Sequence, residues 1–245
     1  MLTRSWRGPG PGRPALPLPP DRMPLLRGGR PLKRWRYAGA YGPELMLCAA
    51  SGRIGVLPFA WWAVWDGERL HEGRRGLELE VSSEGAEIEV VSPHGRQYAW
   101  TRKRVARVRG TFEGRSFDVP GIVDESAGYH ARRTAWHWSA GVGTLASGEP
   151  VAWNLVDGVH DAPEASERTV WVAGEPREVP PVAFDGLRGV GGLSFTPLAT
   201  RARRESYVLI RSDYEQPFGT FAGELPGAGP LAEGWGVMER HNVRW

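Results

Sequence analysis

Alternation of apolar and polar residues with a period of two recurs beyond residue 30 and limits what the chain can fold into. In LELEVSSEGAEIEV (77–90), leucine, valine, alanine and isoleucine alternate with glutamates, and Ser83-Glu84-Gly85 interrupts the pattern. Such alternation is typical of strands with one buried and one wet face, and the interruption predicts a hairpin turn. The chain also contains 33 glycines and 21 prolines, and no window has a sustained 3.6-residue apolar period. We therefore predict an all-β protein.

Three short motifs recur about a hundred residues apart, in the same order along the chain. The pairs are WRYAGAYG (35–42) with WHWSAGVG (136–143), VWDGE (64–68) with VWVAGE (170–175), and GTFEG (110–114) with GTFAG (219–223). Their offsets are 101, about 106 and 109 residues. Collinear matches of this kind indicate an internal duplication.

The duplication predicts two similar antiparallel units, residues 31–121 and 122–245, in which Trp35 overlies Trp136. A unit of about a hundred residues must protect its strand edges, either as a barrel or as a two-sheet sandwich. The predicted seam lies near Pro120 and Gly121.

Residues 1–30 differ in composition from the rest. Residues 1–36 contain nine Lys or Arg and a single acid, Asp21, whereas the remainder carries more acids than bases. RPALPLPPDRMP (13–24) is rich in proline. We expect a Pro/Arg-rich flexible tail over residues 1–30. Peripheral contact of this basic tail with an anionic membrane stays open, but no specific nucleic-acid binding is expected, because interleaved aromatic residues are missing.

Cysteine content and hydropathy bear on the compartment. Cys48 is the single cysteine, so no internal disulfide forms and a reducing environment is favoured. The longest apolar stretch, IGVLPFAWWAVW (54–65), is shorter than the ~20 residues that a membrane span needs. No segment resembles a signal peptide. A cytoplasmic protein without a transmembrane segment is expected, and the oligomeric state is left open.

Several longer motifs carry a family resemblance. KRWRY, AGYHARRTAWHWSAGVG, VAWNLVDGVHD, SERTVWVAGE and GWGVMERHNVRW resemble the bacterial domain-of-unknown-function 2804 family, from about residue 27 to the C-terminus. The chain looks shorter at its N-terminus than is usual for that family. More remotely it is similar to the AttH-like and carotenoid 1,2-hydratase (hydroxyneurosporene synthase) group. That kinship implies two tandem lipocalin-like (calycin-type) barrels or half-open barrels, a hydrophobic cavity and an isoprenoid- or lipid-like ligand.

The aromatic strand TAWHWSAG (134–141) presents two different faces. His137 shares one face with small residues, which leaves space beside the imidazole for a ligand or for a closely packed backbone. Trp136 and Trp138 point the other way. We expect these two indoles in the packed core of a central strand, and they are also candidate ligand contacts.

Further polar residues fall on apolar faces of predicted strands. Glu239 and His241 share a face with valines, and Asn154 lies beside Ala152 and Val156. A buried polar group needs a partner, since leaving it unpaired costs about 1–3 kcal/mol. These residues are therefore expected either to contact a ligand or to be hydrogen-bonded within the core.

Two adjacent acids precede the aromatic strand. Asp124 and Glu125 are the candidate general acids, with His137 as a further catalytic candidate. A carboxylic acid in an apolar cavity keeps its proton to higher pH. It could protonate an alkene while Trp136 or Trp138 stabilises the resulting cation. Ordinary surface acids are the alternative interpretation.

His130, His160 and Asp161 complete the expected ligand contacts, the last two in a polar loop at a cavity mouth. Their spacing with His137 matches no compact zinc signature, so no metal is expected. Phosphate-binding, dinucleotide and nucleophile motifs are missing, so no cofactor is expected.

Two functions of different classes follow. The first is a cofactor-independent hydratase, isomerase or cyclase acting on a hydrophobic small molecule. The second is a non-catalytic carrier or sensor for such a molecule. An acid within hydrogen-bond reach of the cavity favours the enzyme, and an aromatic cavity without one favours the carrier.

Overall fold

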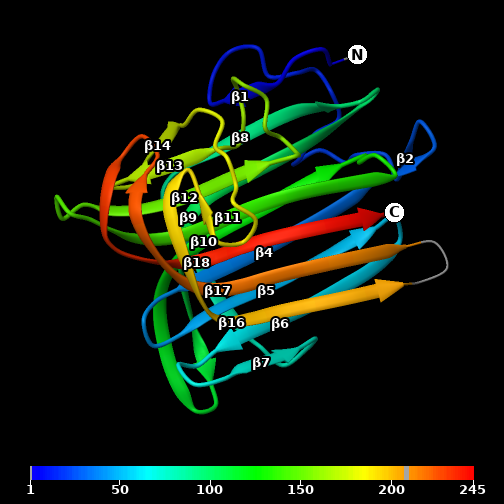
Figure 1. The fold of residues 1–245 in the computed structure, drawn as a ribbon. Coiled ribbons are helices and arrows are strands. Elements are labelled where there is room, and N and C mark those ends of the chain that lie inside the picture. The colour runs from blue at the N-terminus through cyan, green and yellow to red at the C-terminus, as the bar shows by residue number, and fades with distance from the viewer. Residues whose placement is uncertain (1, 207–209) are drawn as a thin grey trace.

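The computed structural model describes residues 2–206 and 210–245, and in this part of the chain the regular structure consists of strands alone (Figure 1). The all-β prediction is confirmed. The strands are β1 Trp6–Gly8, β2 Leu26–Arg27, β3 Arg30–Pro31, β4 Lys33–Tyr41, β5 Met46–Ile54, β6 Leu57–Trp65, β7 Leu70–Gly73, β8 Leu79–His94, β9 Gln97–Phe112, β10 Arg115–Gly128, β11 Arg133–Leu145, β12 Pro150–Asp157, β13 Thr169–Val172, β14 Glu175–Glu178, β15 Gly189–Val190, β16 Gly192–Ser206, β17 Arg211–Leu225 and β18 Gly229–Arg244. Within the described ranges, no helix is long and apolar enough to cross a membrane.

The strands form two large antiparallel sheets. The first sheet has the order β1-β8-β9-β10-β4-β5-β6-β7, and the second has the order β14-β13-β12-β11-β18-β17-β16-β15. β2 and β3 form a separate small ribbon. In each large sheet a four-stranded meander, β4–β7 or β11–β14, is extended by the later strands, the last of which returns beside the first strand of the meander. Both sheets are open: within the described residues, each outer strand has a neighbouring strand on one side only.

This shared strand order is what a duplication would produce. Trp35 and Trp136 lie on β4 and β11, the corresponding first strands of the two meanders. The division into domains 31–121 and 122–245 stays a prediction, and its seam falls inside β10, which pairs continuously with β9 from Arg115 to Gly128. The sheets themselves separate between β10 and β11.

The two sheets bury one hydrophobic cluster in common. It combines Tyr37, Tyr41 and Ile88 of the first sheet with Trp138 and Phe218 of the second. β4 of the first sheet contacts β18 and β11 of the second (Figure 1). Each sheet also has an apolar cluster of its own. The two inner faces therefore depend on each other for their burial.

The expected hairpin at Ser83-Glu84-Gly85 is wrong. Residues 79–94 form the single strand β8, and its register against β9 shifts between Glu84 and Ile88. This bulge packs on the second sheet, where the Ala86 N–H donates to the Gly174 carbonyl at 3.1 Å. Extra residues in a strand and a hairpin turn use the same small and polar residue types, and a glycine serves both.

The structure also differs from the expected flexible tail. β1 pairs with β8, and Leu18 and Met23 are buried in a cluster with Tyr98 and Tyr129. The two tyrosine hydroxyls donate to the carbonyls of Pro17 and Pro24, at 2.9 and 2.7 Å. Proline removes backbone donors but leaves carbonyls free to accept, so a Pro-rich segment can be held by side-chain donors. The average composition of the segment is dominated by basic residues and proline, so it does not indicate that Leu18 and Met23 are buried.

Candidate functional site

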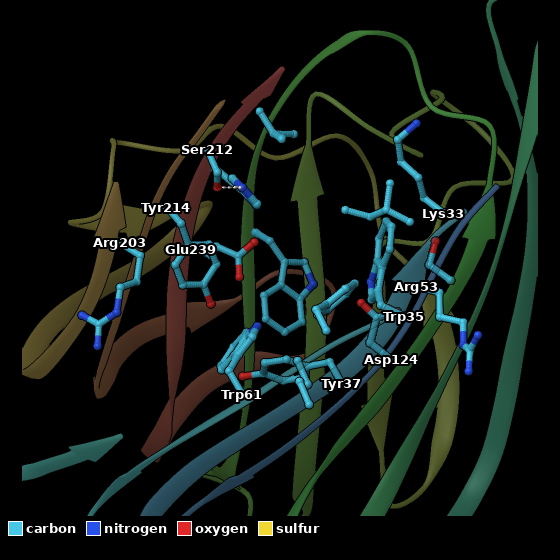
Figure 2. Close-up of a pocket in the computed structure, with 18 of the residues that line it drawn as sticks. Lys33, Trp35, Tyr37, Arg53, Trp61, Asp124, Arg203, Ser212, Tyr214 and Glu239 are labelled. Atoms are coloured by element: carbon cyan, nitrogen blue, oxygen red, sulfur yellow. Dashed lines mark hydrogen bonds between the residues drawn. The ribbon is translucent and has the colours of Figure 1, made fainter. Parts of the chain in front are cut away.

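A pocket of about 1330 Å³ lies between the two sheets, and residues of both line it (Figure 2). Its aromatic lining comprises Trp35, Tyr37, Phe59, Trp61, Trp62, Trp136, Trp138, Tyr214 and Trp245. Figure 2 shows Glu239, Tyr214 and Ser212 on one side of this space, Asp124, Trp35 and Lys33 on the other, and Trp61 and Tyr37 between them at its base. The pocket thus has an aromatic base and two polar sides.

The aromatic base is a set of edge-to-face contacts. Tyr37 meets Trp138 with ring centroids 5.2 Å apart and Trp61 at 6.4 Å, and Trp61 meets Tyr214 at 5.8 Å. The Arg201 guanidinium lies 3.9 Å from the centre of the Trp61 ring. Such contacts fix ring orientation and leave flat apolar faces available to a ligand.

Glu239 is the centre of the first polar side. Its Oε1 accepts a hydrogen bond from Trp136 Nε1 at 2.8 Å, and its Oε2 accepts one from Gln216 Nε2 at 2.9 Å. The Cys48 thiol donates to Gln216 Oε1 at 3.3 Å, which fixes the amide orientation. Burial raises the pKa of Glu239 to about 7, and the negative charge of Asp124 acts in the same direction. Near neutral pH this carboxyl can therefore give or take a proton.

Lys103, Asp124 and Glu167 form the second polar side. The Lys103 ammonium lies 2.7 Å from Asp124 Oδ2 and 3.3 Å from Glu167 Oε1, and all three side chains are buried. Burial lowers the pKa of Lys103, but the two carboxylates outweigh it and raise the pKa above its usual value. Burial also raises the pKa of Asp124, against the opposing effect of Lys103. One buried cation thus faces two carboxyl groups.

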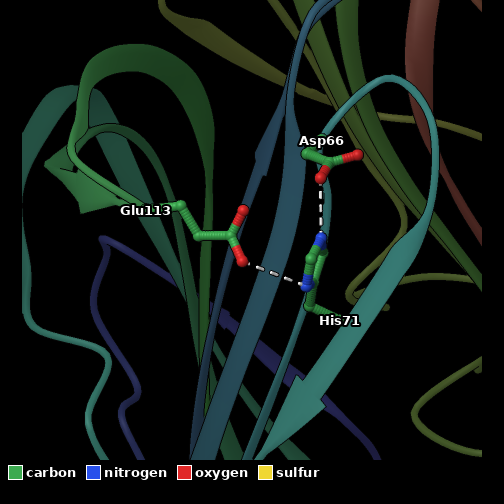
Figure 3. A group of neighbouring side chains, drawn as sticks. All are labelled: Asp66, His71 and Glu113. Atoms are coloured by element: carbon green, nitrogen blue, oxygen red, sulfur yellow. Dashed lines mark hydrogen bonds and ion pairs between the residues drawn. The ribbon is translucent and has the colours of Figure 1, made fainter.

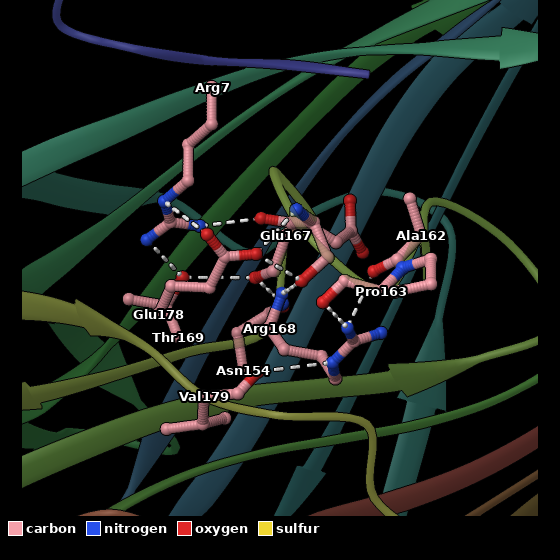
Figure 4. A network of polar contacts seen from close by, with 10 residues as sticks. Arg7, Asn154, Ala162, Pro163, Glu167, Arg168, Thr169, Glu178 and Val179 are labelled. Carbon is pink, nitrogen blue, oxygen red and sulfur yellow. Dashed lines mark hydrogen bonds and ion pairs between the residues drawn. The ribbon is translucent and has the colours of Figure 1, made fainter. Parts of the chain in front are cut away.

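The loop between β12 and β13 carries Glu167 and His160 into the pocket. Buried Arg168 ties this loop together by donating to the carbonyls of Asp161, Ala162 and Val179 (Figure 4). Burial lowers the pKa of His160 to about 4, with Lys103 adding to the shift, so the imidazole is neutral at physiological pH.

The N-terminal segment holds the same loop from outside. Arg7 on β1 donates to the Ser166 carbonyl at 2.6 Å and to Thr169 Oγ1 at 3.1 Å (Figure 4). Its guanidinium also lies 3.9 Å from the Glu178 carboxylate. Residues that were expected in a free tail therefore help to position one side of the pocket.

Seven of the eleven predicted site residues line the pocket. They are Asp124, His130, Trp136, Trp138, His160, Glu239 and His241. His241 stands beside Trp136, with ring centroids 4.4 Å apart, and its Nε2 lies 2.8 Å from Ser212 Oγ. Burial lowers the pKa of His241 to about 4. The roles assigned to these residues stay predictions.

Glu125, His137, Asn154 and Asp161 do not line this pocket. Glu125 points away from Asp124, its neighbour on β10, and accepts hydrogen bonds from Arg102 and Arg104 at 2.8 and 2.9 Å. Burial acts to raise the pKa of Glu125, but these arginines bring it below its usual value. A carboxylate held in its charged form is unsuited to act as a general acid.

The aromatic strand presents the expected two faces, but the pocket lies on the opposite one. Trp136 and Trp138 line it, whereas His137 stacks on Phe184 outside it, with ring centroids 5.6 Å apart. The small residues beside His137 accommodate packing instead, because Trp153 Nε1 donates to Ser139 Oγ at 3.1 Å. A small-residue face indicates either a cavity or close packing, and the sequence pattern does not separate the two.

Asn154 and Asp161 support the pocket from behind. The side-chain Oδ1 of Asn154 accepts a hydrogen bond from Trp138 Nε1 at 2.7 Å, and its Nδ2 donates one to the backbone carbonyl of Glu167 at 2.9 Å. Asp161 accepts from the Gly158 N–H at 2.8 Å and so shapes the loop. Asn154 is thus a satisfied core amide, one of the two alternatives that the sequence left open.

Sequence reasoning missed Lys103, Glu167 and Tyr214. In TRKRVARVRG (101–110) the alternation puts Thr101, Lys103 and Val105 on one face, but the many basic residues suggest a solvated strand. The inward side chains of β9 can be recognised only once the partner sheet is known. Glu167 lies in a loop, where no periodicity applies.

One group elsewhere has the residue types of a metal site. Asp66, His71 and Glu113 lie together at the end of the first sheet, with His71 Nε2 2.6 Å from Asp66 Oδ2 and His71 Nδ1 3.6 Å from Glu113 Oε1 (Figure 3). Arg69 also lies 3.9 Å from each of the two acids. The arginine offsets one of the two negative charges of this group.

A family model described as a domain of unknown function (DUF2804) matches residues 65–245, well over half of the chain. None of the curated proteins compared with the chain matches it significantly.

Three solved structures have a loosely similar backbone over most of this chain. A protein described as an AttH from Nitrosomonas europaea is 12% identical, with a TM-score of 0.42 over 92% of this chain and 98% of that one. Kievitone hydratase from Nectria haematococca is 11% identical, with a TM-score of 0.40 over 84% and 88%. CghA in complex with Sch210972 is 8% identical, with a TM-score of 0.38 over 94% and 95%.

Proposed function

The chain belongs to the DUF2804 family, and we propose that the pocket of this member binds a hydrophobic small molecule and acts on it as a cofactor-independent hydratase, isomerase or cyclase. One observation carries the proposal: three buried carboxyl groups, of Asp124, Glu167 and Glu239, line the same aromatic pocket. Burying a carboxyl group costs free energy unless a partner compensates for the lost hydration, so several such groups at one pocket point to a function. Aromatic side chains provide an apolar surface for a hydrophobic substrate.

The arrangement suits proton transfer to carbon. Glu239, protonated, would donate its proton to one carbon of a substrate double bond, leaving a cation at the other carbon and a carboxylate at Glu239. The faces of Trp136 and Trp138 would stabilise that cation. A water molecule would then add its oxygen to the cationic carbon and return a proton to the Glu239 carboxylate. Loss of a proton from a neighbouring carbon, in place of water addition, gives an isomer. In both routes the acid is regenerated.

A carrier without catalytic activity is the second candidate. It is favoured by the pairing already present, because both oxygens of Glu239 accept hydrogen bonds and Asp124 is ion-paired to Lys103. Such contacts could serve only to hold the polar end of a ligand.

Deuterium incorporation separates the two candidates. The purified protein would be incubated in D₂O with an organic extract of the cells that express it, and the extracted compounds would be analysed by mass spectrometry. An enzyme of the proposed class yields products that carry deuterium on carbon, and Glu239→Gln lowers the yield at least about a hundredfold, the usual scale for a general acid. Glu125→Gln, which alters an acid outside the pocket, should match the wild type. Co-purifying compounds without deuterium would establish the carrier.

A further inference from the structure

The second polar side of the pocket holds an unusual number of buried polar atoms without a protein partner. Within the described residues, these atoms belong to the side chains of Thr101, Asp124, Ser126, His130, His160 and Glu167. All six residues line the pocket and are more than nine-tenths buried. We call these six residues, which lie on the second polar side and not on the aromatic base of the pocket, the polar floor. Buried polar groups are normally satisfied, so the polar floor is built for an occupant that supplies the missing hydrogen bonds.

An occupant must supply both hydrogen-bond donors and hydrogen-bond acceptors to satisfy these unpaired atoms. Asp124 Oδ1 and Glu167 Oε2 offer lone pairs, whereas the Ser126 and Thr101 hydroxyls donate as well as accept. Both ring nitrogens of His160 are unpaired, and a neutral imidazole presents one N–H and one lone pair. A hydroxyl group matches this mixture, because it donates and accepts at one atom.

Anionic groups and quaternary ammonium groups do not match it. A carboxylate or phosphate would face the oxygens of Asp124 and Glu167, and the Lys103 ammonium is already shared between those two acids. The other lysine on this side, Lys33, donates to the His130 carbonyl at 3.3 Å and lies 5.0 Å from the Trp245 ring centre. A quaternary ammonium has no N–H to donate to the two carboxyl oxygens.

We propose that the polar floor binds the hydroxyl groups of an uncharged ligand, so that the molecule bound in this pocket is a hydroxylated hydrophobic compound and not a fatty acid, another anionic amphiphile or a quaternary ammonium compound. The inference rests on the proposed binding of a hydrophobic molecule. It adds the polar end of that molecule, its neutrality and its orientation, with the hydroxyls toward Asp124 and Glu167 and the apolar body on the aromatic base.

Competition between matched head groups tests this specificity. N-Phenyl-1-naphthylamine, a neutral dye, would be bound first, and its displacement by decane-1,2-diol, decanoate and decyltrimethylammonium would be compared at pH 7.5. These competitors share similar alkyl chains. The diol should displace the dye at a concentration at least about tenfold lower than either ion, which corresponds to about 1.4 kcal/mol.

Ser126→Ala gives the residue-level test. Removing a hydroxyl that has no protein partner should leave the melting temperature unchanged or slightly raised. The affinity for the diol should fall about threefold to tenfold, and the affinity for decanoate should not change. Asp124→Asn, which removes one of the two repelling charges, should narrow the preference for diol over decanoate at least about fivefold. Glu125→Gln on the outer face of the same strand is the matched control and should keep the wild-type preference.

The outcomes separate this inference from the proposed function. If the dye binds but diol and decanoate compete equally well, or decanoate competes better, the inference is overturned and hydrophobic binding stands. If the folded wild-type protein binds neither the dye nor the diol, both are overturned. A diol preference that Ser126→Ala leaves intact while lowering the melting temperature would show a structural role for the hydroxyl and would contradict its place in the polar floor.

Discussion

Glu239 is the residue whose chemistry most depends on the fold around it. Trp136 of β11 and Gln216 of β17 donate hydrogen bonds to its carboxyl group. The sequence predicts that this glutamate lies on an apolar face. Its environment comes from strands that are far apart in the chain, so the shift in its pKa could not be predicted from the sequence.

The raised pKa of Glu239 predicts a pH-dependent stability. The folded-state pKa of about 7 exceeds the usual value of 4.5, so folding binds a proton between these two pH values. The stabilisation is complete below pH 4.5 and is lost as pH rises towards 7, by on the order of 3 kcal/mol for a fully developed shift. Urea unfolding of the wild type and Glu239→Gln across pH 4.5–8 measures it. The free energy of the wild type relative to the variant should fall across this range, and a constant difference would contradict the assignment.

At the scale of elements, the sequence predicts strands well and their ends and partners less well. Alternation identifies β8 and β11, because one face of each is apolar over several residues. The sequence predicts a turn where β8 has a bulge, since a glycine with polar neighbours is typical of both. Of the candidate site, the residues on regular strands were found more readily than Glu167, whose loop is shaped by contacts with Arg168 and Arg7.

The bulge is where β8 fits the second sheet, and this fit requires glycine. Gly85 has a φ of +74°, and a Cβ there would lie 2.6 Å from the Gly174 carbonyl oxygen. Gly114 has a similar φ of +79°, with no other atom within 4 Å of its would-be Cβ. Gly114→Ala should therefore cost only the backbone strain of about 1 kcal/mol, and Gly85→Ala should cost at least about 1 kcal/mol more. Equal free energies of unfolding for the two variants would contradict the proposed fit.

The N-terminal segment should act as a strap on the pocket loop. Arg7→Ala removes two hydrogen bonds to residues 166–169 and should destabilise the protein by about 1–3 kcal/mol. Amide hydrogen exchange in residues 158–168 should become faster, because the loop loses its outer anchor. Arg4→Ala, at an exposed position of the same segment, serves as the control. Unchanged exchange in Arg7→Ala would show that Arg7 does not anchor the loop.

At the scale of the whole molecule, the two sheets create what neither has alone. The aromatic strand with which the duplication was recognised contributes Trp136 and Trp138 to the pocket, and Trp35 and Trp61 come from the other sheet. The repeated motifs predict two similar units, but they say nothing about which faces meet. For this reason the sequence predicts an aromatic-rich all-β protein and some of the pocket residues, yet it misses Lys103 and does not decide which face of β11 lines the cavity.

Binding of an apolar molecule between the sheets is the central claim, and a pocket-filling substitution tests it most directly. Ser212 lines the pocket and is half-buried, so Ser212→Trp should fill part of that space. Ala222→Trp, at an exposed position outside the pocket, is the control. Titration with N-phenyl-1-naphthylamine, followed by energy transfer from tryptophan, should give saturable one-to-one binding for the wild type and Ala222→Trp. Affinity should fall at least about tenfold for Ser212→Trp, a loss of about 1.4 kcal/mol. Equal affinity in all three folded proteins would place the dye elsewhere and contradict the claim.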